Sequence, residues 1–280
     1  MHYKILRSDL THHGFVYKLG LNKDTWAFNP SGSGEYGGLY YTDLEHVACF
    51  LDHGELIAMV TPVGQIYEDP LLSKDKPMRW KTDELFLHSI EPLTEWVKKQ
   101  NENTLLSIIE DNAKLFKYIE NPSLEFTSKA IEKNWQVIKY VENPDEKMQL
   151  IAVGKNGSAL EYIKDADYNV QLKAVSQDGI SIRFVKNPTE EMKLIAVRVY
   201  GNSIKYITDP SEEVQLVAVK NNPESIMYIL NPAEEVQMYA VQNACYVYKL
   251  INNPTDRVTE YVENTKKDSN VIGGIQYRSK

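Results

Sequence analysis

The chain has 280 residues, a net charge of −8 and a hydrophobic content of 42%, which fit a globular protein of two domains. The first 100 residues carry 10 Lys/Arg and 14 Asp/Glu, and the rest carry 21 and 25. No basic block therefore favours nucleic-acid binding through bulk charge. The two cysteines make neither a disulfide framework nor a metal knuckle. With no leader-like or membrane-length apolar run, the sequence predicts a cytoplasmic protein and no membrane partner.

Residues 1–100 are predicted to form a small α+β domain, because eight of the 14 glycines occur by Gly64 and short β-type runs alternate with them. A short helix is expected after His13-Gly14, and the Gly/Pro/Ser/Asn-rich stretch from Leu21 to Gly38 is expected to be a functional loop. Further strands and helices are predicted at Tyr3–Leu6, Leu39–Tyr41, Leu56–Thr61 and Glu84–Leu87 (strands) and at Asp43–Leu51 and Pro92–Lys99 (helices).

The second half of the chain repeats every 22 residues. Asn-Pro or Asp-Pro pairs mark six grid points, and Asp165-Ala166 occupies the seventh. The prolines of the grid are Pro122, Pro144, Pro188, Pro210, Pro232 and Pro254. A period without slippage indicates stacked structural repeats. We therefore expect an all-α solenoid of about seven helix-turn-helix repeats over residues 101–265, followed by a tail at 266–280.

Each repeat is predicted to contain two short helices of roughly 10 and 8 residues, which are stable only when stacked. In one repeat, Asp209 is the expected N-cap and Pro210 the first helical residue, and a second helix restarts at Pro223. An aromatic column at Tyr118, Tyr140, Tyr162, Phe184, Tyr206 and Tyr228 favours core packing, with a ligand-facing ladder as the alternative.

The repeats resemble the short helical repeats of many giant-virus, large-phage and protist proteins, a family of unknown function. The resemblance rests on Glu212-Glu213-Val214-Gln215-Leu216 followed by Ile226-Met227-Tyr228-Ile229 and then Asn231-Pro232. It implies an α-solenoid and no activity. All six histidines lie at or before His88, so the array has few groups suited to acid–base chemistry. A protein partner bound by the array is therefore expected.

Three short motifs of the N-terminal domain occur in an order that is informative about its family. They are His13-Gly14, then Gly38-Leu39-Tyr40-Tyr41-Thr42-Asp43, then Glu84-Leu85-Phe86-Leu87. In this order they resemble a minimal ADP-ribosyltransferase of the diphtheria-toxin and poly(ADP-ribose) polymerase type. The domain also resembles an uncharacterised N-terminal region that precedes repeat arrays in giant-virus and phage proteins.

The ADP-ribosyltransferase resemblance implies NAD as cofactor. His13 would bind the adenosine ribose, Gly14 the nicotinamide amide, and Tyr40, with Tyr41 beside it, the nicotinamide ring. Glu84 would bind the nicotinamide ribose and stabilise an oxocarbenium-like transition state, which makes His13, Tyr40 and Glu84 the implied catalytic set. The whole chain would then be a viral or phage-type effector acting in a host cytoplasm.

Each of these residues also has a simpler interpretation. His13 suits a turn, Tyr40 the core of a strand, and Glu84 a solvated strand edge. The alternative function is accordingly a non-enzymatic module that binds or sequesters a protein through the array. Histidine spacing matches no compact metal site, so no metal is expected, and the oligomeric state stays open.

Overall fold

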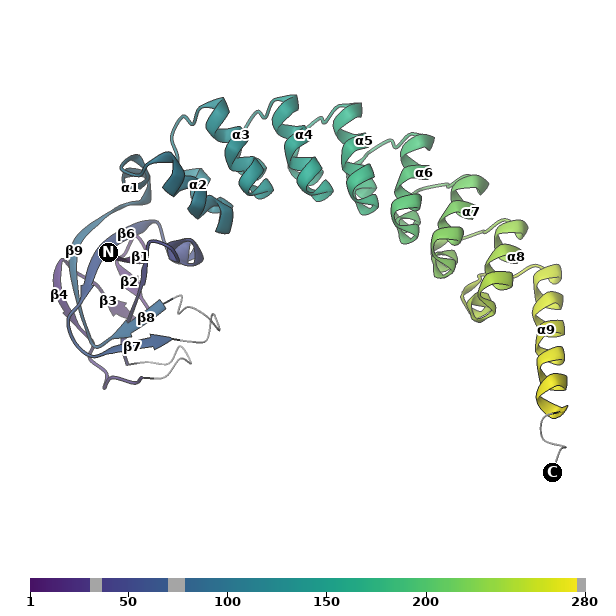
Figure 1. The fold of residues 1–280 in the computed structure, drawn as a ribbon, viewed down its shortest axis with the longest axis horizontal. Helices are drawn as coiled ribbons and strands as arrows, with labels where there is room; N and C mark the ends of the chain where they lie inside the picture. Colours follow the sequence, from purple (N-terminus) through teal and green to yellow (C-terminus); the bar gives the residue numbers. More distant parts are fainter. Residues whose placement is uncertain (31–36, 70–78, 276–280) are drawn as a thin grey trace. The chain divides into compact units, whose positions relative to one another are not determined.

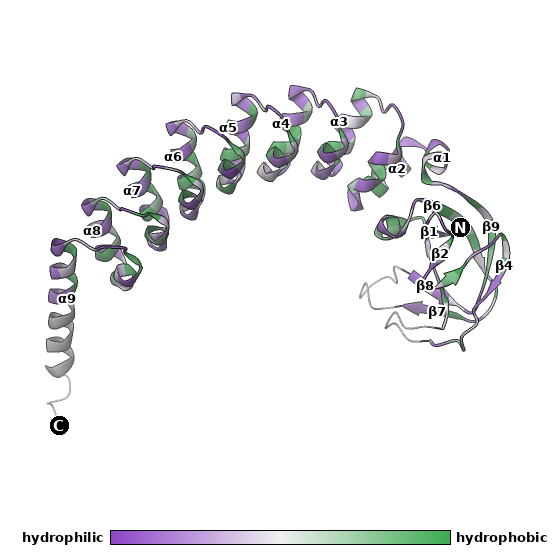
Figure 2. Cartoon of the chain, turned by 180° about the vertical axis from the view of Figure 1, so that it is seen from behind, coloured by the Kyte–Doolittle hydropathy of each residue, from purple (hydrophilic) through white to green (hydrophobic). Residues whose placement is uncertain are grey.

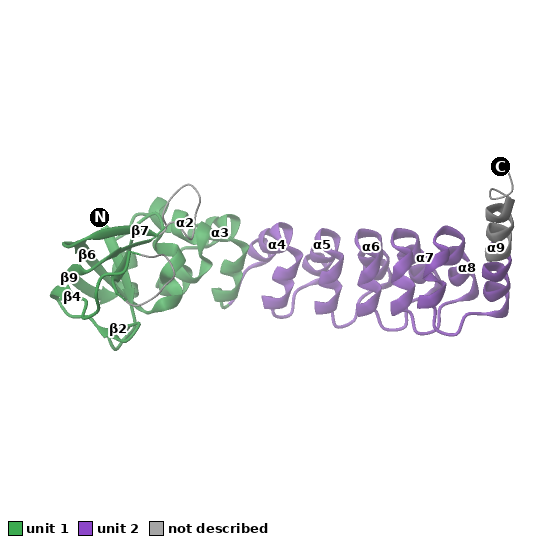
Figure 3. Cartoon of the chain, turned by 90° about the horizontal axis from the view of Figure 1, so that it is seen from below, with its two compact units in different colours: residues 1–142 green, residues 143–280 purple. Residues whose placement is uncertain are grey.

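The structure is a computed structural model that describes residues 1–30, 37–69 and 79–275. Residues 31–36 of the predicted functional loop lie outside the described part. The chain divides into two compact units, residues 1–142 and 143–280 (Figure 3). An antiparallel sheet occupies the N-terminal region and a run of helices follows it (Figure 1). At this level the predicted order of an α+β domain and then helices is confirmed.

The N-terminal sheet has the strand order β4-β9-β6-β1-β5-β8-β7, and β2 and β3 form a separate hairpin. Its pairings are antiparallel throughout. The strands are β1 His2–Leu6, β2 Thr11–His12, β3 Phe15–Val16, β4 Gly20–Lys23, β5 Leu39–Asp43, β6 Leu56–Pro62, β7 Ile66–Asp69, β8 Arg79–Thr82 and β9 Glu84–Pro92.

Strand β1 lies between β6 and β5, and four of its five residues are buried. It packs into an apolar cluster that includes Leu6, Tyr41, Ala58 and Leu87. Burial of this apolar surface is the main stabilising term of the sheet. Lys4 is buried in the same strand, although a lysine is almost never fully buried without a partner.

Two expectations for this region are wrong. The residues after His13-Gly14 form strand β3 and not a helix, because the two residues form a tight hairpin turn that returns the chain. The helix expected at Asp43–Leu51 is the 3₁₀ helix η1, Val47–His53, because Asp43 is still paired in β5 with His2. The second expected helix is found as α1, Leu93–Lys98.

Eight helices alternate with 3₁₀ helices after α1 in the described part of the chain (Figure 1). The α-helices are α2 Glu102–Asp111, α3 Leu124–Lys133, α4 Glu146–Lys155, α5 Tyr168–Gln177, α6 Glu190–Val199, α7 Glu212–Asn221, α8 Glu234–Asn243 and α9 Asp256–Ile275. The 3₁₀ helices are η3 Ala113–Tyr118, η4 Trp135–Tyr140, η5 Gly157–Tyr162, η6 Gly179–Phe184, η7 Gly201–Tyr206, η8 Pro223–Tyr228 and η9 Cys245–Leu250.

The helix boundaries differ from the predicted ones by two residues. Ser211, and not Asp209, caps α7, since its hydroxyl accepts the amide of Val214. Asp209 has φ +47° and turns the chain ahead of Pro210. The second helix of each repeat is a six-residue 3₁₀ helix and not an eight-residue α-helix, and in η8 the Asn222 side chain caps the amide two residues later. Hydrophilic residues gather along the connections between helix pairs (Figure 2).

The first helix pair packs on the sheet region within the first unit. Helices α2 and η3 contact η1, the Asn112 side-chain amide donates to the Ala48 carbonyl at 2.9 Å, and Lys114 pairs with Asp52 at 2.7 Å. The compact unit therefore extends beyond residue 100, where the sequence suggested a domain boundary.

Within residues 143–280, consecutive repeats contact one another closely. A Cβ at Gly157 or Gly179 would lie 2.5 or 2.4 Å from the carbonyl oxygen of Ala174 or Ala196 in the next repeat, so only glycine fits there. Gln215 adds a second link. Its side-chain amide donates to the Pro210 carbonyl and its oxygen accepts the Ala233 amide of the following repeat. Gln237 repeats this arrangement with Pro232 and Thr255.

The C-terminal segment expected to be a tail is helical as far as Ile275, at the end of α9. Across the residues that the structure describes, no helix is both long and apolar enough to cross a membrane.

Candidate functional site

His13 and Gly14 form the two-residue turn of the β2–β3 hairpin. Thr11 pairs with Val16 and His12 with Phe15, so only these two residues connect the strands. Both have positive φ, +50° and +78°, as a type I′ turn requires at its two central positions. The turn thus places the His13 imidazole at the tip of the hairpin. The simpler interpretation of His13 as a turn residue is consistent with this geometry.

Tyr40 lies in β5 opposite Lys81 of β8 and is 8% exposed. The Arg79 guanidinium carbon lies 4.5 Å from the centre of the Tyr40 ring, and the Lys81 ammonium lies 5.2 Å from it. Such distances allow cation–π attraction. Arg79 is held in place by the fully buried Asp69, with Nε and Oδ2 2.6 Å apart. Positive charge therefore surrounds the tyrosine ring.

Lys4 brings a third cation to the same place. Its ammonium donates to the Tyr40 carbonyl at 2.7 Å and lies 4.5 Å from the Tyr17 ring centre. Because burial disfavours the charged form, it lowers the pKa of Lys4 to about 7. At neutral pH this lysine can hold or release a proton, so its charge responds to any anion that comes near it.

The structure brings His13, Gly14 and Tyr40 together around one cavity of about 390 Å³, within the range of roughly 300–1,000 Å³ typical of ligand pockets. Its other lining residues include His12, Tyr17, Asp24, Trp26 and Gly38. Gly38 has φ +136°, and a Cβ there would lie 2.4 Å from the Lys81 side chain. Tyr41, in contrast, belongs to the core and stacks on Trp80 at 5.9 Å, and it lines only a smaller neighbouring cavity.

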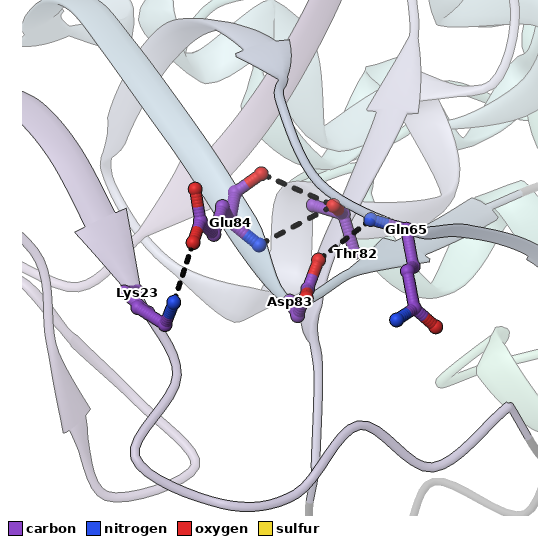
Figure 4. Close-up of polar contacts among 5 residues, drawn as sticks. All are labelled: Lys23, Gln65, Thr82, Asp83 and Glu84. Carbon is purple, nitrogen blue, oxygen red and sulfur yellow. Dashed lines mark hydrogen bonds and ion pairs between the residues drawn. The ribbon is translucent and has the colours of Figure 1, made fainter.

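Glu84 is not among the described residues that line these cavities. It begins β9 opposite Lys23 of β4, and its carboxylate accepts from the Lys23 ammonium at 2.7 Å (Figure 4). The backbone of Glu84 bonds with the Thr82 hydroxyl, and neighbouring Asp83 accepts the Gln65 amide at 2.7 Å. The position of Glu84 fits the strand-edge interpretation and lends no support to a catalytic role.

Asp24 is the carboxylate that lines the cavity, and sequence reasoning missed it. It follows β4, accepts the Trp26 amide at 3.1 Å through one oxygen, and binds the Gly38 amide through the other. These bonds fix the entrance of the loop beside Tyr40. The bond to the Trp26 amide two residues on is an Asx-turn contact, so the stretch from Asp24 to Trp26 carried a signal for the turn but none for the cavity.

Three histidines adjoin the cavity. The ring of His12 lies 4.2 Å from that of His13 and stacks on that of His53 at 5.5 Å, centre to centre. Burial first, and then the nearby charge of Lys4, lowers the pKa of His12 to about 2. The pKa values of His13 and His53 are lowered as well, chiefly by burial. All three imidazoles are therefore neutral at pH 7.

One group of described residues has the spacing of metal ligands, Asp43, Glu45 and His46. The Asp43 carboxylate accepts the His46 amide at 2.9 Å and contacts the His46 ring nitrogen at 2.8 Å. These bonds stabilise the turn that leads into η1, which accounts for the grouping without an ion.

The repeats contain a further hollow, of about 710 Å³, between two consecutive repeats. Lys164, Lys186, Phe184 and Gln171 line it beside Ala166, the grid point without proline. Half-exposed rings continue along this column at Tyr162 and Tyr228, 39% and 40% exposed. The aromatic column is therefore only partly packed inside the array.

Comparisons of the chain with protein-family models, curated proteins and solved structures find no match.

Proposed function

We propose that the N-terminal domain binds NAD or a related nucleotide in the cavity of His13, Gly14 and Tyr40. The observation that carries this proposal is the convergence of the His13-Gly14 turn and Tyr40, which are distant in sequence, on one cavity of ligand size. Nearby Lys4 and Arg79 suit the pyrophosphate of such a ligand, and Trp26, 62% exposed on the cavity wall, offers a stacking surface for a base.

The proposal stops at binding and does not extend to transfer by Glu84. A catalytic carboxylate must lie within reach of the reacting ribose, and Glu84 is bound to Lys23 outside the cavity lining. Asp24 is the carboxylate in the right place, but both of its oxygens hold backbone amides. A non-enzymatic, NAD-type binding domain is therefore favoured over an active ADP-ribosyltransferase.

Calorimetric titration of the full chain with NAD tests the binding proposal. His13→Asn removes the imidazole and keeps the turn, because Asn-Gly is a preferred type I′ pair, and we expect it to weaken binding about tenfold. Glu84→Gln is the matched control and should bind NAD like the wild type. Absence of saturable NAD binding by the wild type would end the proposal. Nicotinamide release that disappears in Glu84→Gln would instead restore the transferase.

We further propose that the repeats form an α-solenoid that binds a protein partner. The close contacts at Gly157 and Gly179 favour a continuous stack, and the hollow at Ala166 offers a binding surface with two lysines and a ring. With the resemblance of the repeats to viral and phage arrays, the whole chain would be an effector in a host cytoplasm.

The array proposal is tested by affinity capture with the full chain. A double variant, Lys164→Glu with Lys186→Glu, should lose the partner, whereas Lys155→Glu on α4 should keep it. Equal capture by both would show that the hollow is not the binding surface.

A further inference from the structure

A second cavity, of about 240 Å³, opens beside the nucleotide cavity. It is lined by Arg7, His12, His13, His53 and Asp52. A narrow neighbouring space, lined by the same three histidines together with Lys4 and Arg79, adjoins it. Five basic side chains therefore line these two spaces together with His12, namely Lys4, Arg7, His13, His53 and Arg79. The nucleotide proposal requires neither His53 nor Arg7.

Two carboxylates near this cluster are paired with cations, and a third, Asp9, accepts from the Thr11 amide and hydroxyl and interacts with Arg7. Asp52 pairs with Lys114 at 2.7 Å, and Asp69 pairs with Arg79 at 2.6 Å. The remaining local charge is positive, from Lys4 and Arg7. After burial, Lys4 helps to lower the pKa values of all three histidines, and Arg7 helps to lower those of His12 and His13. Asp52 has the opposite effect on His53. An anion in the cavity would relieve this repulsion.

We propose that the cluster of Arg7, His12, His13 and His53 is a binding site for a phosphate group. Guanidinium and imidazole N–H groups are strong donors to phosphate oxygens, and the cavity has room for a small anion. A shared metal ion fits less well, because the three imidazoles are too far apart to ligate one ion together in the described structure, and the nearby cations repel it.

Phosphate binding should be coupled to proton uptake. A dianion facing Lys4, Arg7, Arg79 and the Asp52–Lys114 pair favours the charged imidazolium, so it raises the histidine pKa values. Protonated histidines in turn bind phosphate more strongly, so phosphate binding at pH 8, where free phosphate is mainly the dianion, should take up protons from the buffer.

Inorganic phosphate is the probe, titrated into the full chain by calorimetry at constant ionic strength with chloride as the reference salt. Imidazole NMR signals report the histidine pKa values with and without phosphate. We expect saturable binding, higher pKa values for His12 and His53, and about tenfold weaker binding in Arg7→Gln. Because Arg7 is exposed, this variant should fold. His88→Gln, at the Thr61 contact on β9, is the matched control and should bind normally.

Two sources of phosphate are separated by further arms of the experiment. AMP offers a phosphomonoester and ADP-ribose a pyrophosphate. The ligand whose affinity falls in Arg7→Gln uses the site, and a ligand whose affinity is unchanged does not. Phosphate binding without NAD binding would uphold this inference and end the nucleotide proposal. Equal NAD affinity in Arg7→Gln and wild type, together with no saturable binding of phosphate, would uphold the nucleotide proposal and overturn this inference. Zinc binding through the histidines with no effect of phosphate would also overturn the inference.

Discussion

Ser203→Ala should make the protein more stable. Ser203 of η7 is fully buried, and its hydroxyl has no hydrogen-bond partner within the described structure. The oxygen lies 2.9 Å from the Cβ position that Gly179 of the preceding repeat would have, so it faces the contact between consecutive 3₁₀ helices. A buried, unpaired hydroxyl costs roughly 1–3 kcal/mol, and its removal leaves only a small void.

We therefore expect Ser203→Ala to raise the free energy of unfolding by about 1 kcal/mol. With a slope of roughly 1–3 kcal/mol per molar urea, the midpoint of unfolding should rise by about 0.3–1 M. Urea titration followed by far-UV circular dichroism measures this shift. Ser181 and Ser225 occupy the same column with the same buried, unpaired hydroxyl, so each should respond in the same direction.

The opposite substitution, from alanine to serine in the same column, provides a control. Ala159 stands in this column in η5 and is fully buried, so Ala159→Ser introduces the hydroxyl into the same packing and should lower the midpoint by a similar amount. A lower midpoint for Ser203→Ala, or no effect of Ala159→Ser, would show that the buried hydroxyls are bound and would refute the reasoning.

Three further predictions concern the lysine in β1, the glycine contacts and the gap in the grid. Because the folded pKa of Lys4 is about 7 and the unfolded one about 10.4, the unfolded chain binds more protons between these values, and stability should rise with pH there. Urea midpoints at pH 7 and 10 should differ in the wild type and much less in Lys4→Met; an equal rise in both would contradict this. Gly179→Ala should lower the free energy of unfolding by about 2 kcal/mol or more, because its Cβ would lie 2.4 Å from the Ala196 carbonyl oxygen. The thermal midpoint of unfolding should fall accordingly. Gly154→Ala is the control, because its Cβ would meet only the end of the Lys173 side chain, at 3.6 Å, and it should raise the free energy of unfolding by about 0.5–1 kcal/mol. Equal changes in stability for the two variants would exclude close stacking at Gly179. Ala166→Pro should raise the free energy of unfolding by about 0.4–1 kcal/mol and should weaken capture of the protein partner. Full capture by this variant would show that the partner binds away from the hollow at Ala166.

The period of 22 residues was enough to predict the helical half, because each repeat presents the same apolar face to its neighbours. The helix ends were harder. Pro210 fits both the first helical position and the loop before the helix, and the hydroxyl of Ser211 decides between them by capping Val214. The 3₁₀ form of the second helix depends on caps such as Asn222, whose bond two residues on favours a tight turn.

The site was predictable only in part. His13-Gly14 and Tyr40 were found because short motifs fix them. Asp24 and the pairing of Glu84 with Lys23 depend on strand register between β4 and β9, which the sequence does not specify. Lys4 was missed because a lysine inside an apolar strand is indistinguishable, by pattern, from an outward-facing residue of an amphipathic strand.

The glutamine links between repeats have a mechanical consequence. Gln215 and Gln237 each tie the start of one helix to the next, so a pull on one repeat is passed to its neighbour through a hydrogen bond. Lys193 holds the equivalent position in α6 and pairs with Glu190 instead, since an ammonium has no acceptor to offer. Under tension, the contact after α6 should therefore stretch more easily than the contacts after α7 and α8.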